Sequence, residues 1–357
     1  MHHHHHDCQH DKIDRRPPTI VPQQRQRRRR LNRDSSPPPP LRVVFWPLLE
    51  VDGRTCYAEG DHVDVGEVAF NCTADNVLTP EKQVALTRLL DAAAAWLSAA
   101  FAAVEPVVGA LSVANTPCGF GGDVSIPPDI LANGAPATDV LTFVTARPII
   151  GTALAFAGHC QEDQGSSAYV PRRPSVGHIN VSPASLERLV LANRESAAAG
   201  SGAAGASATS VDAASADAAA ADAAAIADLL GVMLHEAFHV LGFSQSKLRE
   251  LPCPAALDYD RHDAATYEPR PCAAAGSSEP VVPSTHGPAD GRAHLLLVTP
   301  RVRQMARVHY GCEHLEGVPL EACRGGSDCL TGTGTASSHW EKRVLLGEVL
   351  LSDIDCF

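Results

Sequence analysis

The sequence has no apolar run long enough to cross a bilayer. Its most apolar stretch, Ala92–Val104, has 13 residues between Asp91 and Glu105, whereas a membrane-spanning helix needs about 20. We therefore expect no transmembrane helix and place this stretch in a helix of the protein core. The opening residues 1–12, MHHHHHDCQHDK, also lack the apolar segment of a signal peptide.

Basic residues are scarce outside the N-terminal arm. Residues 1–33 hold nine of the 29 Lys and Arg residues and three of the 41 acidic residues, which leaves 20 basic and 38 acidic residues for the remainder, a net charge of −18. Phosphate contacts require Lys and Arg, so we expect no nucleic-acid partner. The basic arm itself has the composition of a disordered segment.

Cysteine, in contrast, is plentiful. The chain contains 11 cysteines, which favours an oxidising compartment and therefore an extracellular or cell-surface location. The odd number leaves at least one thiol unpaired if all others pair within the chain. Because no signal peptide is visible, we expect the true N-terminus to be absent from this sequence or misassigned.

The chain divides into an arm and a globular part. Residues 1–40 combine a His/Cys cluster, the run RQRRRR at 25–30 and the run SSPPPP at 35–40, and we expect a disordered, propeptide-like arm and linker. The composition becomes globular from Leu41. An Ala/Ser-rich insertion at 196–224 interrupts it, and its alanine-rich second half is expected to extend the following helix backward.

Periodicity predicts the main elements of the globular part. Strands are expected in LRVVFWPLL from Leu41, in Val140–Val144, in Ala153–Ala157 and in Val176–Val181. Helices are expected over Thr79–Val104, with Thr79 as cap and Pro80 in the first position, over Thr299–Tyr310, and from about Ser338 to Leu351.

The stretch GVMLHEAFHVLGFS, Gly231–Ser244, carries the pattern of a catalytic zinc site. On a helix, His235 and His239 lie on one face and can bind one ion. Glu236 lies about 100° around the helix, where its carboxylate can take a proton from a zinc-activated water. The alternative is an ordinary amphipathic helix with two histidines, but chance rarely supplies the glutamate, the apolar flanks and the helix-stopping Gly242 together.

A compact zinc motif would place the third histidine at position 245, which is Gln245. The histidines after Gly242 are His262, His286, His294, His309, His314 and His339. Position alone does not choose among them.

Several blocks of the sequence resemble the leishmanolysin family of zinc metallopeptidases, within the metzincin clan. They are PCGFGGDVSIP at 117–127, TDVLTFVTARP at 138–148, AFAGHCQ followed by VGHINV, HEAFHVLGFS at 235–244, ARVHYGCEHLEG at 306–317 and GTASSHWEKR at 334–343. The resemblance implies that His339 is the third ligand of one Zn²⁺ per chain. His309 and His314 are the weaker alternatives. It also implies a Cys118–Cys160 disulfide, for which a buried free thiol is the alternative.

The fold that the resemblance implies is α+β. A metzincin-like catalytic subdomain, residues 41–243, would hold a mixed sheet and the active-site helix, and a smaller Cys-rich subdomain, residues 244–357, would supply His339. Leu350 stands where the clan has a methionine beneath the zinc, a swap that nearly conserves volume. Family members continue past the position of Phe357, so we expect the second subdomain to be truncated here.

The implied function is that of a zinc endopeptidase with Glu236 as general base, acting on a polypeptide bound as an extended strand along a sheet edge. One alternative is a catalytically silent surface adhesion or binding relative, although it would have no reason to keep Glu236. A second is a structural zinc site, which normally has four protein ligands. The oligomeric state is not predicted.

Two expectations concern the arm. The stretch HDCQHD around Cys8 is similar to the family's propeptide segment, which implies that the Cys8 thiolate blocks the zinc in a latent form. The four consecutive arginines before the Pro-rich linker predict a maturation cleavage near Arg30, with a solvated basic run as the equally plain alternative.

Overall fold

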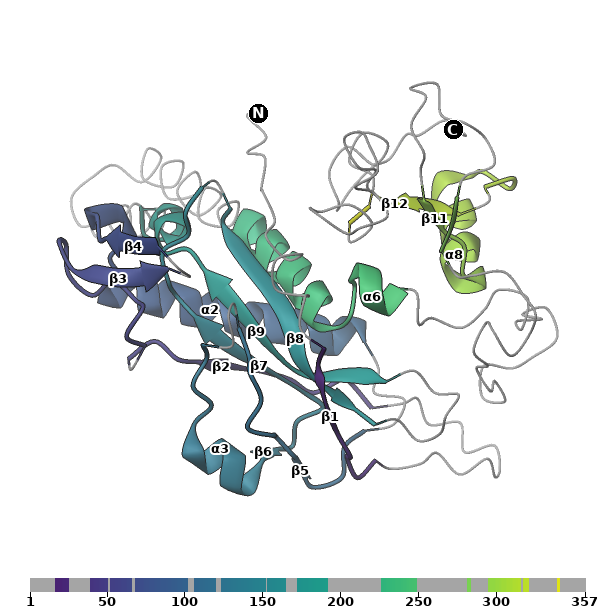
Figure 1. Ribbon diagram of the computed structural model, residues 1–357. Coiled ribbons are helices and arrows are strands. Elements are labelled where there is room, and N and C mark those ends of the chain that lie inside the picture. Colours follow the sequence, from purple (N-terminus) through teal and green to yellow (C-terminus); the bar gives the residue numbers. More distant parts are fainter. Residues whose placement is uncertain are drawn as a thin grey trace, which may run out of the picture.

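The computed structural model describes thirteen stretches of the chain (Figure 1). They are residues 17–25, 39–50, 52–65, 68–101, 106–119, 123–151, 153–164, 172–191, 226–248, 281–283, 295–315, 317–320 and 339–340. Every structural statement below refers to these residues.

A mixed five-stranded sheet forms the centre, in the order β1-β8-β9-β7-β2. Its strands are β1 (Thr19–Val21), β2 (Val43–Pro47), β7 (Val140–Thr145), β8 (Ala155–Asp163) and β9 (Arg173–Val181). β2, β7 and β9 are parallel, β8 is antiparallel to β9, and β1 runs parallel to β8. The predicted α+β fold with a mixed sheet is confirmed.

Both faces of the sheet are covered, and β7 shows why its sequence is apolar throughout. Val140 and Val144 point into one apolar cluster, while Leu141 and Phe143 point into another. The alternation follows from the two-residue period of a strand. All six residues of β7 are buried, and each fully buried large apolar side chain contributes about 1.5–3 kcal/mol.

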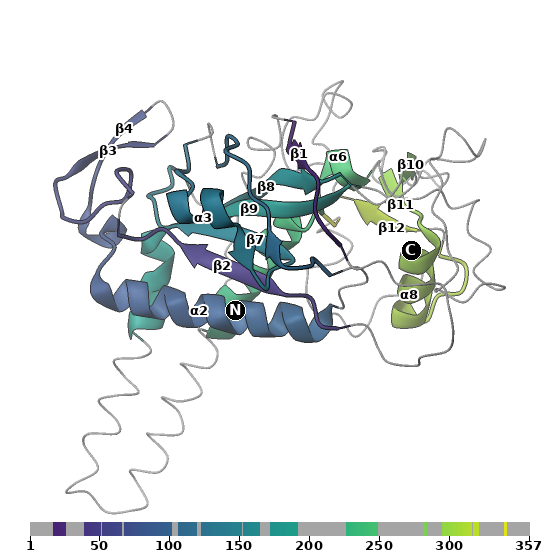
Figure 2. The same cartoon turned by 90° about the horizontal axis from the view of Figure 1, so that it is seen from below.

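Two helices cover the first face. Helix α2 (Pro80–Ala100) runs along the sheet in Figure 2 and buries Leu86, Leu89, Leu90 and Leu97. Its N-terminus matches the prediction, because the Thr79 hydroxyl accepts a hydrogen bond from the Lys82 amide and Pro80 follows the cap. The helix at 226–240 adds Met233, Ala237 and Val240 to the same cluster. The second face is covered by α3 (Pro128–Asn133) and the pair β5 (Ala110–Leu111) and β6 (Ala135–Pro136).

Smaller elements complete the N-terminal part. The hairpin of β3 (His62–Val65) and β4 (Val68–Asn71) is closed by a Cys56–Cys72 disulfide. Two 3₁₀ turns follow, η1 (Ala74–Asn76) and η2 (Pro183–Leu186). The short helix α6 (Gln245–Leu248) comes directly after the 226–240 helix.

The C-terminal part contains a separate three-stranded antiparallel sheet in the order β10-β11-β12. Its strands are β10 (Val281–Pro283), β11 (Leu295–Leu297) and β12 (Val318–Leu320), and helix α8 (Pro300–Tyr310) lies between β11 and β12 in the chain. Helix α8 ends at Gly311, which adopts a left-handed φ of 61°.

Several predicted elements need correction. Strand β8 is six residues longer than predicted at its C-terminal end, because pairing with β9 continues to Asp163. Helix α2 ends at Ala100, because Phe101 is extended and its ring packs against Trp96 and Phe238. The helix predicted from about Ser338 does not include Trp340, which forms a β-bridge with Leu320. The rest of that segment and the insertion at 196–224 lie outside the described residues.

One described part of the N-terminal arm, residues 17–25, differs from the expectation of disorder. Residues 19–21 form strand β1, because β8 offers an edge with which they pair. Among the described residues no helix is both long and apolar enough to cross a membrane.

Candidate metal centre

The first two histidines of the site lie on the 226–240 helix. Met233, Ala237 and Val240 anchor one side of this helix in the core. Val240 lies against Gly177 of β9, where an added Cβ would come within 2.4 Å of the Val240 Cγ1. The helix can approach the sheet this closely only because position 177 is glycine. His235 and His239, one turn apart, stand with their ring centroids 4.8 Å apart.

The third histidine comes from a distant part of the chain. His339 precedes Trp340, whose backbone forms a bridge with Leu320 of β12 and whose ring centroid lies 4.9 Å from that of Phe243. Phe243 follows the metal-motif helix, so this aromatic contact joins the two parts of the chain. His339 is 1% exposed, and it is the neighbouring Trp340 that places it beside the helix.

The three Nε2 atoms form a nearly equilateral triangle. The separations are 3.1 Å between His235 and His339, 3.2 Å between His235 and His239, and 3.1 Å between His239 and His339. Three imidazoles that bind one Zn²⁺ tetrahedrally at 2.0–2.1 Å have nitrogens about 3.3 Å apart. The donor set therefore fits zinc, and the described residues supply three ligands, the number typical of catalytic rather than structural sites.

The hydrogen bond behind His239 sets its tautomer. Its Nδ1 lies 2.7 Å from the Phe243 carbonyl oxygen, which can only accept. Nδ1 must therefore carry the proton, and the lone pair of Nε2 points toward the other two histidines. Such a hydrogen bond orients a metal-binding imidazole and increases its basicity.

Glu236 is the acidic group of this site. It follows His235 on the helix and is fully buried, at 0% exposure. A carboxylate is a hydrogen-bond acceptor, and in this position it can take a proton from a water beside the three histidines. Among the described residues, the triad is the only group of three potential metal-binding side chains within 4.8 Å of one another.

A buried charged cluster ties the segment after the helix to the sheet. The Glu162 Oε1 of β8 lies 3.1 Å from the Lys247 Nζ and 3.1 Å from the His159 Nε2. Burial acts to raise the pKa of Glu162, but the hydrogen bond from His159 and the charge of Lys247 outweigh it and lower the pKa. Lys247 lies four residues after Phe243, so this ion pair holds the segment whose carbonyl orients His239.

A second buried imidazole, His178 of β9, lies on the face of the sheet away from the 226–240 helix, because its neighbour Gly177 is the residue that faces Val240. The Thr145 hydroxyl donates to the Asn180 Oδ1, so His178 Nε2 must donate to Thr145, at 2.8 Å. Burial lowers the pKa of His178 to about 3, and the charge of Arg147 acts in the same direction. Arg147 is itself held by Asp52 and Asp123. His178 is thus a neutral structural imidazole, unlike the three at the metal centre.

The other predicted site residues divide into three sets. Cys118 and Cys160 form a disulfide, with Cα atoms 5.1 Å apart. His309 and His314 are exposed and lie outside the triad. Cys8, Leu350, Arg30, His262, His286 and His294 lie outside the described residues.

Sequence reasoning missed the supporting residues, namely Phe243, Trp340, Glu162 and Lys247. The one available signal was Trp340, which follows His339 in the block GTASSHWEKR. Glu162 contacts Lys247, and Phe243 contacts Trp340, in each case across more than 80 positions of the sequence. The hydrogen bond between Phe243 and His239 is the one local contact of this set.

Comparison with known proteins adds independent evidence. A family model described as leishmanolysin matches residues 32–196 and 204–356. A leishmanolysin-like peptidase of Drosophila pseudoobscura pseudoobscura is 25% identical over 232 residues, which cover 61% of this chain and 27% of the relative. One from Caenorhabditis elegans is 26% identical over 249 residues, 62% of this chain and 28% of the relative. Leishmanolysin of Leishmania major is 30% identical over 132 residues, 37% and 21% of the two chains. The chain thus spans about a quarter of the length of the curated relatives that it matches.

Proposed function

This chain belongs to the leishmanolysin family of peptidases, and from that premise we propose that it is a zinc-dependent endopeptidase. The observation that carries the proposal is the triangle of His235, His239 and His339, together with a buried glutamate that follows His235 on the helix. Two of the histidines come from a helix and the third from a segment 100 residues further on, an arrangement that the family's HExxH motif and distant third histidine would require.

The roles of the residues follow from their chemistry. His235, His239 and His339 would hold Zn²⁺, which when bound supplies a Lewis acid that lowers the pKa of a water to about 7. Glu236 accepts the proton of the attacking water and returns it to the leaving amine. The Phe243 carbonyl keeps His239 in the tautomer whose Nε2 is a free lone pair.

The substrate in this proposal is a polypeptide bound as an extended strand. Apart from the short strand β1 that pairs with it, β8 is the outermost strand on the side of the central sheet that contacts the segment after the metal-motif helix, through Glu162 and Lys247. The other edge, β2, instead lies near α2. We therefore assign β8 as the edge along which a substrate strand runs toward the site.

The division of the chain belongs to the same proposal. Residues 41–243 form the catalytic subdomain and residues 244–357 the subdomain that supplies His339. Leu350 takes the place of the methionine beneath the metal, Cys8 blocks the metal in a latent form, and cleavage near Arg30 accompanies maturation. The disulfides Cys56–Cys72 and Cys118–Cys160 support an extracellular or cell-surface location, since such bonds persist in oxidising compartments.

The second candidate is a catalytically silent binding or adhesion relative. The fully buried Glu236 argues against it, because an ionisable group is costly to bury and a silent protein would gain nothing from it.

The test is proteolysis of an unfolded protein by the zinc-loaded chain and by Glu236→Gln. Loss of a general base should lower the rate by about 10²–10⁴-fold while zinc stays bound. Glu59→Gln, the same change at an exposed position, should retain the wild-type rate. Equal rates for wild type and Glu236→Gln would refute hydrolysis by this site, and no activity in any protein despite bound zinc would favour the silent relative.

A further inference from the structure

Residues 17–25, just before the arginine run, are docked on the outer edge of β8. Thr19, Ile20 and Val21 pair in parallel with Gln161, Glu162 and Asp163. The Gln164 amide also donates to the Val21 carbonyl at 3.3 Å. These pairs satisfy backbone groups of β8 that would otherwise lie open at a sheet edge.

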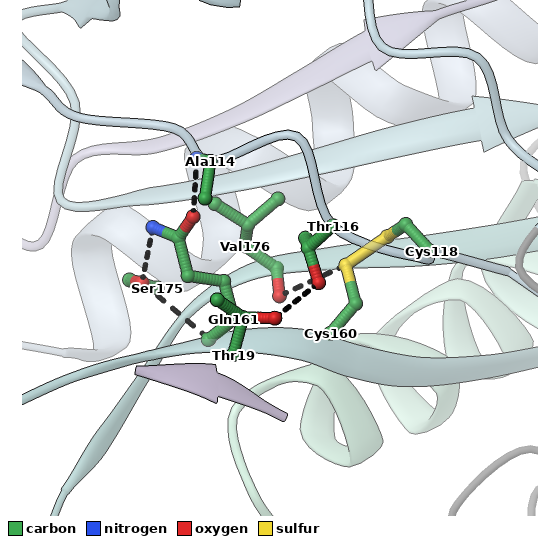
Figure 3. The surroundings of a disulfide bond; sticks show 8 residues. All are labelled: Thr19, Ala114, Thr116, Cys118, Cys160, Gln161, Ser175 and Val176. Carbon is green, nitrogen blue, oxygen red and sulfur yellow. Dashed lines mark hydrogen bonds between the residues drawn. A yellow bond between two sulfur atoms is a disulfide. The ribbon is translucent and has the colours of Figure 1, made fainter. Parts of the chain in front are cut away.

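A second wall holds the other side of this segment. The Gln23 side-chain amide donates to the Ser112 carbonyl at 2.8 Å and accepts from the Ser112 amide at 2.9 Å. The Val108 amide donates to the Gln24 carbonyl at 2.7 Å. Figure 3 shows the opposite end, where the Thr19 and Thr116 hydroxyls are hydrogen-bonded and Gln161 reaches the Ala114 amide. Residues 107–116 therefore form one wall and β8 the other.

One contact in this arrangement is charged. The Arg25 guanidinium pairs with the Asp163 carboxylate, and their side chains are only 10% and 4% exposed. A carboxylate buried to this extent requires a cationic partner, because an isolated buried charge is costly. The walls thus select for an extended backbone, a side-chain amide and an arginine at fixed spacing.

We propose that β8 and residues 107–116 form a binding site for an extended polypeptide with an arginine four residues after its strand, and that residues 17–25 fill this site in the same chain. The site lies apart from the histidine triad, to which it is joined through Glu162, Lys247 and the Phe243 carbonyl. Its consequence for catalysis rests on the proposed function: a substrate strand can pair with residues 161–163 only after residues 17–25 leave.

The position of the anchors has a consequence for maturation. Every contact named above is made by residues 19–25, whereas the four consecutive arginines occupy positions 27–30. A cut among those arginines leaves all of the anchoring residues on the N-terminal fragment. The severed arm therefore stays bound as a separate peptide, and displacement is a second step.

Hydrogen exchange of the full-length chain tests the docking without reference to catalysis. Gln23→Ala removes two hydrogen bonds and should speed exchange in residues 17–25 and at the outer edge of β8 by about tenfold. Gln24→Ala is the matched control, because only the backbone carbonyl of Gln24 is used, and it should exchange like wild type. Equal exchange in the two variants, or unprotected residues 17–25 in wild type, would overturn the proposal.

Cleavage of the full-length chain tests the binding site itself. After an endoprotease specific for paired arginines has cut the run, the N-terminal fragment should co-elute with the body in size exclusion. An excess of synthetic peptide 17–25 should displace it, and so should the Gln24→Ala peptide. An Arg25→Ala peptide should displace the fragment only at an about tenfold higher concentration, because it cannot form the buried ion pair. Spontaneous loss of the fragment, or equal competition by all three peptides, contradicts the site.

Proteolysis by the same samples separates the two proposals. Release of the fragment should raise peptide hydrolysis. If exchange and competition behave as stated but no sample hydrolyses peptides, the polypeptide site stands and the endopeptidase falls. If the cut chain is fully active with its fragment still bound, residues 17–25 do not occupy the substrate edge and this proposal fails alone.

Discussion

At the scale of single residues, the molecule uses imidazole in two opposite ways. His239 is polarised by a carbonyl and aims a lone pair at two other histidines. His178 is buried on the face of β9 away from that helix and is hydrogen-bonded to Thr145. The difference lies in the surroundings: ring nitrogens face one another at the metal centre, whereas burial, together with the charge of Arg147, lowers the pKa of His178 and keeps it neutral.

His178 predicts a component of acid sensitivity. Its pKa is about 3 in the folded chain against 6.5 for an ordinary histidine, so below pH 6.5 the unfolded state binds more protons and stability falls. The slope approaches about 1.4 kcal/mol per pH unit between the two values. His178→Gln should flatten the dependence of the free energy of unfolding on pH between 6.5 and 4, measured by denaturant titration.

The control is His62→Gln, the same change at an exposed position of β3, which should keep the wild-type slope. The quantity compared is the slope rather than the stability itself, because His178→Gln also changes a buried hydrogen bond. An unaltered slope in His178→Gln would show that another group is responsible for the acid sensitivity.

At the scale of elements, the site depends on a contact between two segments distant in the sequence. The 226–240 helix is set against β9 by the absence of a side chain at Gly177. The segment with His339 is set against β12 by the Trp340 bridge. The two meet where the rings of Phe243 and Trp340 pack, next to buried Leu320.

Trp340→Ala should therefore weaken zinc binding although Trp340 is not a ligand. Loss of the ring removes the contact with Phe243 and loosens both His339 and the carbonyl that orients His239. Changes that disturb the support of a ligand typically cost 10–100-fold in affinity, and we expect about that factor in competition with a chromogenic chelator.

Trp96→Ala is the matched control for this prediction. Trp96 also packs against an aromatic residue of the helix, Phe238, but it is 43% exposed and has no contact with the triad. Its loss should leave zinc affinity within about threefold, as expected of surface changes. Equal losses for both tryptophans would place the effect in general stability.

At the scale of the whole molecule, the proposed zinc site couples the two parts of the chain. His235 and His239 belong to one part and His339 to the other, so a bound ion would hold them together. Zinc at a hundredfold excess over its dissociation constant should stabilise the folded chain by about 2.7 kcal/mol, visible as a rise in Tm that a chelator reverses.

His339→Ala should abolish most of that rise, whereas His314→Ala, at an exposed position, should retain it. A rise in Tm that survives His339→Ala would assign the third ligand to another group. Calorimetric binding by both variants gives the stoichiometry, for which we expect one zinc per chain.

The local features of this protein follow from residues that are close together in the chain. The four-residue spacing of His235 and His239 and the flanking apolar residues specify a helix with one metal-binding face, and Gly242 ends it with a φ of 100°. The apolar runs specify β7, β8 and β9, and Thr79 with Pro80 specifies the start of α2. These features could be predicted because each depends on residues within a few turns of one another.

The surroundings of that helix, in contrast, depend on contacts between distant parts of the chain. Among six later histidines, spacing alone did not single out His339, and family resemblance was needed to name it. The Glu162–Lys247 pair, the Phe243–Trp340 contact and the docking of Arg25 on Asp163 each join residues distant in sequence. The basic, Pro-rich composition of the arm predicts disorder, because such a segment has little apolar surface to bury. Residues 19–21 of this arm form a strand only because β8 presents backbone groups and a buried carboxylate that composition cannot reveal.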